Sequence, residues 1–384
     1  MEVELVAVLP DSGPGSKPTA RPMTLSGDGS GRTFVADQNG QVLQLHAGGS
    51  VSVFLDLGSA TSLFADQRQR GLSSFAFHPD YFDSGADGFG KFYTSSSEPT
   101  SAGTPDYPVP AGAPESHHSV IYEWTASGDP DVIDPGSARE ILRVGETYDD
   151  HNIGQISFRP GLSPAHPDYG LLFVAMGDGG NVCCPRPSVD PWFAGQDVTT
   201  LLGTILRIDP LEPPGGGVPY TFPSDNPYAS DGDPLTLGEI WAYGLRNPHR
   251  FAWDRGGDGR MLISDIGQAN VEEINLGALG ANYGWSDREG TYSVMHFNED
   301  DVFPLPGNDA TFGYTYPVLQ YDHDEDDRAI SGGFVQRQAV GSSLEGRYLF
   351  GDLTSGRVFH ADVDALDGSG QAAFERLRLI DVAD

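Results

Sequence analysis

A histidine beside two carboxylates is the first group in the chain that could do chemistry. The segment Asp149-Asp150-His151-Asn152 is followed by a glycine and a run of strand-forming residues. Because an imidazole titrates near neutral pH, His151 is a candidate general base. A histidine in a turn that caps a strand is the alternative interpretation, and this segment taken alone favours it.

Two further turns carry side chains that suit catalysis or ligand binding. In the turn 176–181, Asp178 could orient a histidine or could simply shape a hairpin. In Gly-Leu-Arg246-Asn247-Pro, the guanidinium offers a bidentate cation for a carboxylate, and the amide offers a partner for a carbonyl. A surface arginine paired with one of the many acids is the alternative interpretation of Arg246.

Two acidic turns contain the hard oxygen ligands that Ca²⁺ takes. The first runs from Ser264 to Asn270, is followed by two glutamates, and offers backbone carbonyls at a glycine. The second, 321–327, has alternating aspartates but lacks the glycine and distal glutamate of an EF-hand loop, so a solvated acidic loop is the preferred interpretation. The chain has no Gly-x-Ser-x-Gly elbow, His-Glu-x-x-His, P-loop, dinucleotide fingerprint or cysteine-based nucleophile, so serine and cysteine hydrolases have no support.

Short strands must position these turns, because long helical periodicity is absent. Aromatic and aliphatic runs alternate with Gly, Asp, Asn and Pro, and several share one pattern: a strand, a tight turn with Asp and Gly, and a second strand. Examples are 33–36 with 41–45, 91–94 with 120–124, 171–175, 204–208, 239–243, 260–263, and 347–350 with 356–360.

This repetition predicts an all-β fold, specifically a six-bladed β-propeller that forms a single domain over residues 1–384. Dividing the 384 residues by six leaves about 64 for each blade, which suits four strands with long loops. The stretches 99–116 and 210–234 are rich in Pro, Gly and Ala, and we interpret them as loop insertions within the domain.

Composition excludes several classes of partner. The chain has 55 acidic and 22 basic residues, a net charge of −33, and no basic stretch, which argues against binding to nucleic acid or to anionic membranes. No apolar run is long enough to span a bilayer. The two cysteines, Cys183 and Cys184, are adjacent, so a vicinal disulfide and two separate thiols both remain open, and the spacing of a zinc site is absent.

Taken in order, ten segments make the chain similar to the soluble pyrroloquinoline quinone (PQQ)-dependent aldose sugar dehydrogenases, often called the glucose/sorbosone dehydrogenase family. They span about three-quarters of the chain, and the Gly-Leu-Arg-Asn-Pro and Gly-Gln…Glu-Glu-Ile-Asn motifs are the most specific. The segments are 70–81, 151–161, 172–181, 201–210, 223–228, 239–254, 264–275, 281–285, 331–337 and 346–358.

The resemblance implies a propeller with PQQ on its axis, held through Ca²⁺ and a ring of basic side chains. His151 matches the family's general base, which takes the proton from the anomeric hydroxyl of the sugar as a hydride passes to the quinone. Asp178 matches the carboxylate that orients this histidine. Arg246 and Asn247 match the pair that contacts the quinone oxygens, where the arginine can stabilise developing negative charge.

The remaining roles implied by the resemblance concern metal and cofactor binding. Gly267 and Gln268 match positions whose backbone carbonyls bind the quinone-linked Ca²⁺. Arg337 and Arg357 lie near basic positions that bind the cofactor, and Glu273 and Tyr283 match a second, structural Ca²⁺ site. Two departures stand out: Arg70 replaces the usual Glu or Gln, and Ile266 replaces a residue that can be polar.

The resemblance therefore predicts a PQQ- and Ca²⁺-dependent sugar dehydrogenase that passes electrons to a further acceptor, as a monomer or homodimer. The segment Met1–Leu5 lacks the basic and apolar regions of a signal peptide, and we expect a periplasmic or secreted protein whose signal has been removed. Two alternatives keep the propeller. One is a Ca²⁺-assisted lyase-like enzyme on an acidic polysaccharide, and the other is a non-catalytic ligand-binding propeller.

Overall fold

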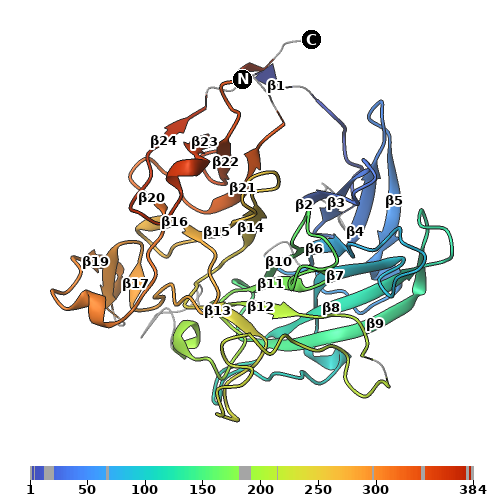
Figure 1. Cartoon of the computed structure of the whole chain (residues 1–384), viewed down its shortest axis with the longest axis horizontal. Coiled ribbons are helices and arrows are strands. Elements are labelled where there is room, and N and C mark those ends of the chain that lie inside the picture. The colour runs from blue at the N-terminus through green and yellow to red at the C-terminus, as the bar shows by residue number, and fades with distance from the viewer. Residues whose placement is uncertain are drawn as a thin grey trace. The chain divides into compact units, whose positions relative to one another are not determined.

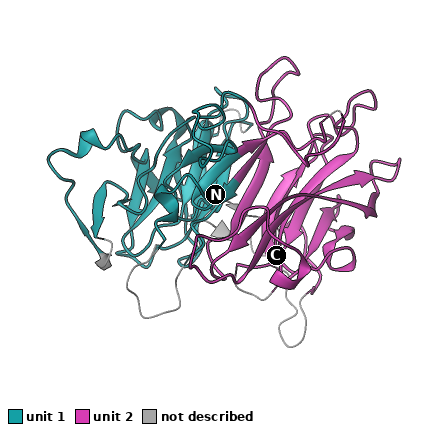
Figure 2. Ribbon diagram, turned by 90° about the horizontal axis from the view of Figure 1, so that it is seen from below, with its two compact units in different colours: residues 1–3, 175–206, 224–384 teal, residues 4–174, 207–223 magenta. Residues whose placement is uncertain are grey.

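The fold consists almost entirely of strands. The computed structural model describes residues 2–3, 5–12, 21–65, 69–180, 192–213, 215–295, 298–338, 342–377 and 380–381, in which no α-helix occurs. The chain forms two compact units, one of residues 1–3, 175–206 and 224–384 and the other of residues 4–174 and 207–223 (Figure 2). We call them unit 1 and unit 2, and we describe each by itself.

Two four-stranded antiparallel sheets lie wholly within unit 2, drawn from blue to cyan-green in Figure 1. In both sheets the strands are neighbours in the order in which they follow along the chain. The first sheet contains β2 (Pro22–Gly27), β3 (Thr33–Asp37), β4 (Gln41–Leu45) and β5 (Val51–Asp56). The second contains β6 (Leu72–Phe77), β7 (Lys91–Glu98), β8 (His117–Ala126) and β9 (Ile133–Glu146).

Unit 1 holds two more four-stranded antiparallel sheets and two smaller ones. One contains β14 (Arg250–Trp253), β15 (Met261–Asp265), β16 (Val271–Leu276) and β20 (Leu319–Asp322), and the other β21 (Ile330–Gln336), β22 (Arg347–Asp352), β23 (Val358–Asp362) and β24 (Phe374–Arg376). Between β16 and β20 the chain inserts a three-stranded sheet of β17 (Arg288–Glu289), β18 (Tyr292–Met295) and β19 (Asn298–Phe303). A short parallel pair joins β1 (Glu2–Val3) to β25 (Ile380–Asp381).

A further four-stranded sheet also has its strands in the order in which they follow along the chain. It contains β10 (Ile153–Phe158), β11 (Leu172–Met176), β12 (Thr204–Ile208) and β13 (Ile240–Tyr243), in that order. The described residues form five four-stranded sheets, one three-stranded sheet and one two-stranded sheet, and the prediction of an all-β, six-bladed propeller is confirmed. The prediction of a single domain remains a prediction.

Hydrophobic side chains fill the space between successive sheets within each unit. In unit 2, Phe34, Phe75 and Phe92 are almost fully buried between the first two sheets, and the rings of Phe75 and Phe92 stack with centroids 5.7 Å apart. In unit 1, a second cluster joins the sheets of β14 and β21 through Leu262, Tyr348 and Phe350 among others. Burying each such side chain stabilises the fold by about 1.5–3 kcal/mol, so these interfaces hold neighbouring sheets together.

A glycine turn joins β3 to β4. The chain reverses between β3 and β4 at Gly40, which has a φ of 114°. Glycine adopts this backbone conformation readily, whereas other residues are strained in it. A Cβ at Gly40 would lie 2.2 Å from the side chain of Leu63, so the close approach also requires glycine there.

The predicted loop insertions contain little regular structure. Segment 99–116 carries one short 3-10 helix, and Tyr107 forms an isolated bridge with Val144. Within 210–234, Thr221 pairs with Asp209, and Pro214 lies outside the described residues. The five short 3-10 helices of the described residues are η1 (Leu57–Ser59), η2 (Thr100–Ala102), η3 (Ala194–Gln196), η4 (Asp309–Thr311) and η5 (Val363–Ala365).

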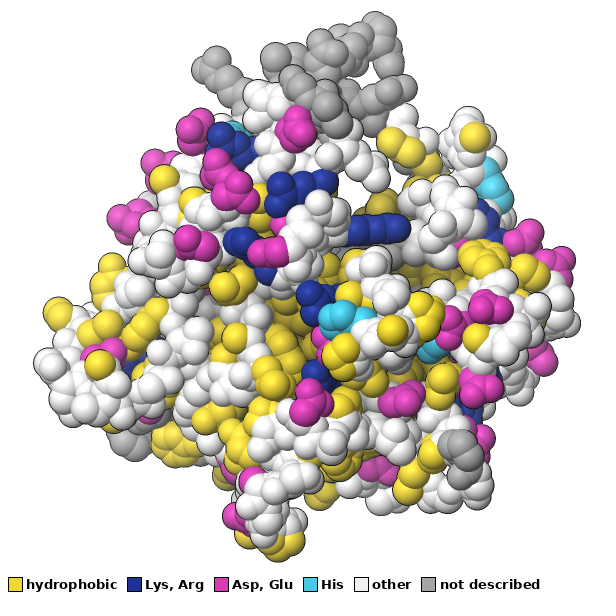
Figure 3. Space-filling view, viewed as in Figure 1, with side chains coloured by type: hydrophobic (Ala, Val, Ile, Leu, Met, Phe, Trp, Pro, Cys, Tyr) yellow, Lys and Arg dark blue, Asp and Glu magenta, His cyan; other side chains and the backbone are white. Residues whose placement is uncertain are grey.

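Acidic side chains are spread over the face of the molecule drawn in Figure 3 rather than gathered in one patch. No helix among the described residues is long and apolar enough to cross a membrane.

A buried histidine makes a testable contribution to stability in unit 2. His78 follows β6 and is 3% exposed, and its Nδ1 accepts the backbone N–H of Asp80 at 3.1 Å, so this nitrogen carries no proton. Burial lowers the pKa of His78 to about 4, although the charges of Asp80 and Glu123 oppose that shift. The same turn recurs at His166, whose Nδ1 accepts the N–H of Asp168 at 3.0 Å.

We expect His78 to destabilise the fold in mild acid. Its pKa when folded is below the unfolded value of about 6.5, so the unfolded state binds the extra proton and stability is lost as the pH falls from about 6.5 towards 4. A shift of this size corresponds to a loss of about 3 kcal/mol in the free energy of unfolding.

Urea unfolding at pH 7 and pH 4.5 checks this prediction. His78→Asn keeps an acceptor for Asp80 and should lose much of the difference between the two pH values, whereas the control His46→Asn, at an exposed histidine, should keep it. An unchanged pH dependence in His78→Asn would contradict the assignment.

Candidate functional site

Unit 1 brings together three turns that carry predicted site residues. Asp178 follows β11, Arg246 and Asn247 lie between β13 and β14, and Gly267 and Gln268 lie in the hairpin between β15 and β16. Each turn comes directly after a buried strand, so rigid elements position the polar side chains.

Arg246 is held from several sides but keeps one donor unused. Arg246 is 6% exposed. Its Nη1 donates to the carbonyl oxygen of Ile266 at 2.8 Å, and its Nη2 donates to Oε1 of Gln268 at 2.5 Å. Among the described residues its buried Nε has no hydrogen-bond partner, and neither has the buried Oδ1 of Asn247. A buried polar atom without a partner costs about 1–3 kcal/mol, so these two atoms mark a place where a bound group would complete the site.

Asp265 holds the backbone of the Arg246–Asn247 turn. Its Oδ2 accepts the N–H of Arg246 at 3.0 Å and its Oδ1 accepts the N–H of Asn247 at 2.6 Å. Burial raises the pKa of this carboxyl, and the two N–H groups act in the opposite direction. The carboxylate therefore fixes the direction in which both neighbouring side chains leave the turn.

We expect Asp265→Asn to loosen that turn. An asparagine has one acceptor oxygen, so one of the two N–H groups would face an NH₂ group and lose its partner, at about 1–3 kcal/mol in the free energy of unfolding. Urea unfolding measures this loss, and Asp258→Asn, which changes an exposed partner of Arg260, is the matched control. Equal stability of Asp265→Asn and wild type would contradict the proposed clamp.

Glu289 holds the loop that carries Gln268. Its Oε1 accepts the backbone N–H groups of residues 268, 269, 270 and 271 at 2.9–3.0 Å. The loop closes so tightly that a Cβ at Gly267 would lie 1.7 Å from the carbonyl oxygen of Val271. Glycine at position 267 is therefore a steric requirement of this loop.

Trp285 links Asp178 to Arg246. The indole N–H donates to Oδ2 of Asp178 at 2.8 Å, while Oδ1 of Asp178 accepts the N–H of Gly180 at 2.9 Å. The centre of the Arg246 guanidinium lies 5.5 Å from the centroid of the Trp285 ring, within cation–π range. Asp178, Arg246 and Trp285 therefore form one buried cluster in unit 1.

His151 belongs to unit 2 and is described there by itself. His151 is 5% exposed, and its backbone N–H donates to Oε1 of Gln69 at 2.8 Å. Strand β10 begins two residues later. Its φ is 52°, a left-handed value that is uncommon for a residue other than glycine. Strained backbone of this kind clusters at functional sites. The pairing of His151 with Asp178 remains a prediction.

The two other predicted cofactor-binding arginines are paired with acids in unit 1. Arg337 forms a two-point contact with the fully buried Asp254, with Nε–Oδ1 and Nη2–Oδ2 distances of 2.8 and 2.6 Å. Nη1 of Arg357 lies 2.6 Å from Oδ2 of Asp327 and 3.1 Å from Oε2 of Glu325. An anionic ligand would have to compete with these carboxylates for either arginine, whereas no such pair is observed for Arg246 among the described residues.

The predicted structural Ca²⁺ site has partners of its own in unit 1. Glu273 accepts the N–H of Gly290 and the amide of Asn275, and burial raises its pKa above the usual range. The Tyr283 hydroxyl donates to the carbonyl oxygen of Leu276 and accepts the N–H of Ala278. Among the described residues no group of three or more His, Cys, Asp and Glu side chains is arranged to hold a metal ion.

The two departures from the family pattern, Ile266 and Arg70, have structural partners. Ile266 packs against the hydrophobic cluster of unit 1, and the guanidinium of Arg70 lies 4.3 Å from the centroid of the Phe64 ring in unit 2. Cys183 and Cys184 lie outside the described residues.

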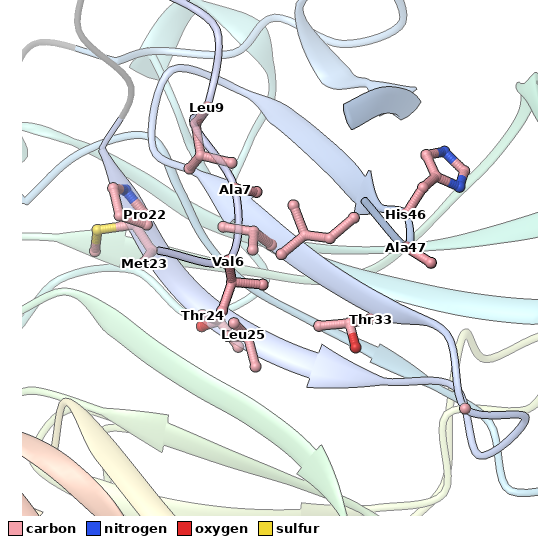
Figure 4. A pocket seen from close by; sticks show the side chains of 13 residues that line it. Val6, Ala7, Leu9, Pro22, Met23, Thr24, Leu25, Thr33, His46 and Ala47 are labelled. Atoms are coloured by element: carbon pink, nitrogen blue, oxygen red, sulfur yellow. The ribbon is translucent and has the colours of Figure 1, made fainter. Parts of the chain in front are cut away.

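An apolar groove lies in unit 2. It has a volume of about 620 Å³ and lies between the segment that contains Val6 and Leu9 and the strands β2, β3 and β4 (Figure 4). Of the described residues that line it, His46 alone titrates, and none is a predicted site residue. Among the described residues that line the groove, the imidazole of His46 is thus the one group that could take part in acid–base chemistry.

Three residues of the candidate site are not indicated by any single sequence motif. Asp265, Trp285 and Glu289 had no assigned role, although the first two lie inside segments of the family pattern. The hydrogen bonds that give them roles join residues 18 to 107 positions apart, so local spacing could not reveal them.

The repeated four-stranded sheets define an all-β propeller fold that matches those of solved PQQ-dependent sugar dehydrogenases. The profile of the family described as Glucose / Sorbosone dehydrogenase matches residues 19–383, and the chain belongs to this family. The chain is similar in structure to the PQQ-bound aldose sugar dehydrogenase of Streptomyces coelicolor, with a TM-score of 0.61 and 19% sequence identity. The alignment covers 98% of this chain and 86% of the Streptomyces chain. This likeness shows the fold.

Curated relatives include proteins of another kind. The chain is 30% identical to the HIPL1 protein of Arabidopsis thaliana over 91% of its length, and 28% identical to the human Hedgehog-interacting protein over 85%. It covers 53% and 40% of those two proteins, respectively, so the chain spans about half or less of the curated relatives that it matches.

Proposed function

We propose that the chain is a PQQ- and Ca²⁺-dependent dehydrogenase that oxidises the C1 hydroxyl of aldose sugars to the lactone. The observation that carries this proposal is the pair of buried atoms without partners among the described residues, Nε of Arg246 and Oδ1 of Asn247. They lie at the turn that the sequence resemblance matches to the quinone contacts. A cation beside an amide suits a group that has both negative charge and carbonyl oxygens. PQQ has both, so the residues at this turn fit the cofactor.

PQQ, when bound, supplies the acceptor for the hydride that leaves C1 of the sugar. The protein residues contribute the polar part of the reaction. A ring nitrogen of His151 takes the proton of the C1 hydroxyl, and Asp178 orients that imidazole and stabilises its protonated form. Arg246 and Asn247 bind the cofactor oxygens, and the guanidinium stabilises negative charge as it develops there.

The other residues in the proposal hold the cofactor and metal ions. The backbone carbonyls of Gly267 and Gln268 would bind the Ca²⁺ associated with PQQ. Arg337 and Arg357 would contact the carboxylates of PQQ by exchanging their present acidic partners, and Glu273 and Tyr283 would hold a structural Ca²⁺. We also propose that the protein acts in the periplasm or outside the cell and passes electrons to a separate acceptor.

Dye reduction with a panel of aldoses tests this function. We expect sugar-dependent reduction only after incubation with both PQQ and Ca²⁺, and loss of the activity when a chelator is added before PQQ. Sugar-dependent reduction that is equally fast without PQQ would contradict the proposal.

A ligand-binding propeller without catalysis is the second candidate. The curated relatives matched over most of the chain include Hedgehog-interacting proteins, and the pairing of Arg337 and Arg357 with acids reduces the positive charge available for PQQ. A folded chain that does not bind PQQ would favour this candidate.

A further inference from the structure

The position of Trp285 in unit 1 is fixed on several sides. The residue is 3% exposed, its backbone N–H donates to the carbonyl oxygen of Gly244 at 2.9 Å, and its carbonyl oxygen accepts a hydrogen bond from Nε2 of Gln196 at 2.6 Å. A Cβ at Gly195 would lie 2.9 Å from Cδ1 of the indole, so the chain passes directly against the ring. The indole therefore has little freedom to change its orientation.

The edge of this ring orients Asp178. The indole N–H and the N–H of Gly180 each bind a different oxygen of the carboxylate, at 2.8 and 2.9 Å. Two donors on two oxygens fix the plane of a carboxylate, and hydrogen bonds to an ionised acceptor are the stronger kind. The indole N–H thus determines where the carboxylate of Asp178 points.

The face of the same ring supports Arg246. The guanidinium carbon lies 5.5 Å from the ring centroid, while Nη1 and Nη2 are bound to Ile266 and Gln268. Packing against an aromatic face restricts a planar guanidinium and leaves its edges available for hydrogen bonds. The N–H of Asp178 also donates to the carbonyl oxygen of Arg246 at 2.8 Å, so the two residues are joined through their backbones as well.

We infer that Trp285 is a positioning residue for both parts of the proposed reaction, a role that rests on the proposed function. Its N–H sets the orientation of Asp178 and hence of the proton acceptor, and its ring face sets the orientation of the arginine that contacts the cofactor. The two roles belong to different parts of one side chain, so substitutions can separate them.

Trp285→Phe and Trp285→Leu make this separation. Phenylalanine keeps an aromatic face and loses the N–H, so kcat should fall about tenfold or more while the Kd for PQQ with Ca²⁺ stays within about threefold of wild type. Leucine loses both features, so the Kd should rise about tenfold or more in addition. Absorbance or fluorescence titration measures the Kd without turnover, and sugar-dependent dye reduction measures kcat.

A matched control and a double variant exclude a general packing defect. Trp124 in unit 2 is also fully buried and donates its N–H to Oγ1 of Thr94 at 2.9 Å, so Trp124→Phe removes an equivalent hydrogen bond and should leave kcat and Kd unchanged. If the indole acts through Asp178, Trp285→Phe should lower kcat much less in an Asp178→Asn background than in wild type.

The possible results distinguish this inference from the function on which it rests. If the wild type shows PQQ-dependent turnover and Trp285→Phe has the same kcat as the wild type, the inference is overturned and the proposed dehydrogenase function stands. A fall in kcat that is equally large with and without Asp178→Asn would overturn the proposed route through Asp178. Absence of PQQ-dependent turnover in the wild type would overturn the proposed function and the inference with it.

Discussion

Replacing His151 with asparagine is expected to lower kcat for aldose oxidation by about two to four orders of magnitude. General-base catalysis typically contributes a factor of about 10² to 10⁴, and asparagine cannot accept a proton at neutral pH. Steady-state dye reduction with saturating PQQ and Ca²⁺ measures the change. His151→Ala should show a loss of the same size.

The choice of asparagine separates catalysis from folding. His151 has a φ of 52°, and asparagine is among the residues that adopt this left-handed region most readily. The Kd for PQQ and the melting temperature should therefore stay close to wild type. His166→Asn, in a turn that places its imidazole against Asp168, is the control and should leave kcat unchanged. Turnover of His151→Asn within about twofold of wild type would remove the general-base assignment.

The second large effect is expected from Arg246→Ala. In the proposed complex, Arg246 and the anionic PQQ form a buried charged pair. Truncating one member of such a pair costs about 2–5 kcal/mol, so the Kd for PQQ should rise by about 30-fold or more. Arg246→Lys keeps the charge but loses the planar fork that reaches both Ile266 and Gln268, and an intermediate weakening is expected. Titration of the apo protein with PQQ and Ca²⁺ measures both variants.

Arg260→Lys is the matched control for this experiment. Arg260 is also in unit 1 but binds Asp258 and the carbonyl oxygens of Val363 and Leu366, which are not part of the candidate site. Its substitution should leave the Kd for PQQ unchanged. If Arg246→Ala bound PQQ as tightly as wild type, the Arg246–Asn247 turn would not be the cofactor site.

Much of the strand structure could be predicted from the sequence because the signals are local. Residues 204–208 form β12 as predicted, and residues 33–36 and 41–45 lie in β3 and β4 around the glycine turn at Gly40. Aromatic and β-branched residues bounded by turn residues are sufficient for such predictions. The inserted sheet of β17–β19 was less accessible, because dividing chain length by a blade size gives no place for an insert.

The site was predictable only where a residue type carries its own chemistry. Arg246 and Asn247 were found because a guanidinium beside an amide suggests ligand binding, and the structure then added their two unpartnered atoms. Asp265 and Trp285 resemble ordinary core residues in the sequence, and their roles depend on hydrogen bonds that only the fold creates.

The state of an arginine was equally inaccessible from the sequence. Arg337 and Arg357 looked equivalent to Arg246 as candidate anion ligands, yet the fold pairs them with Asp254 and Asp327. With 55 acidic and only 22 basic residues, most arginines in this chain will meet a carboxylate, and spacing alone cannot identify the exceptions.

Titration of the apo protein with PQQ and Ca²⁺, followed by anaerobic addition of an aldose, tests the central claim most directly. We predict saturable binding of one PQQ per chain, and then a change in the cofactor spectrum that requires the sugar and is lost in His151→Asn. A correctly folded protein that binds no PQQ would contradict the account and favour a binding propeller or a lyase-like enzyme.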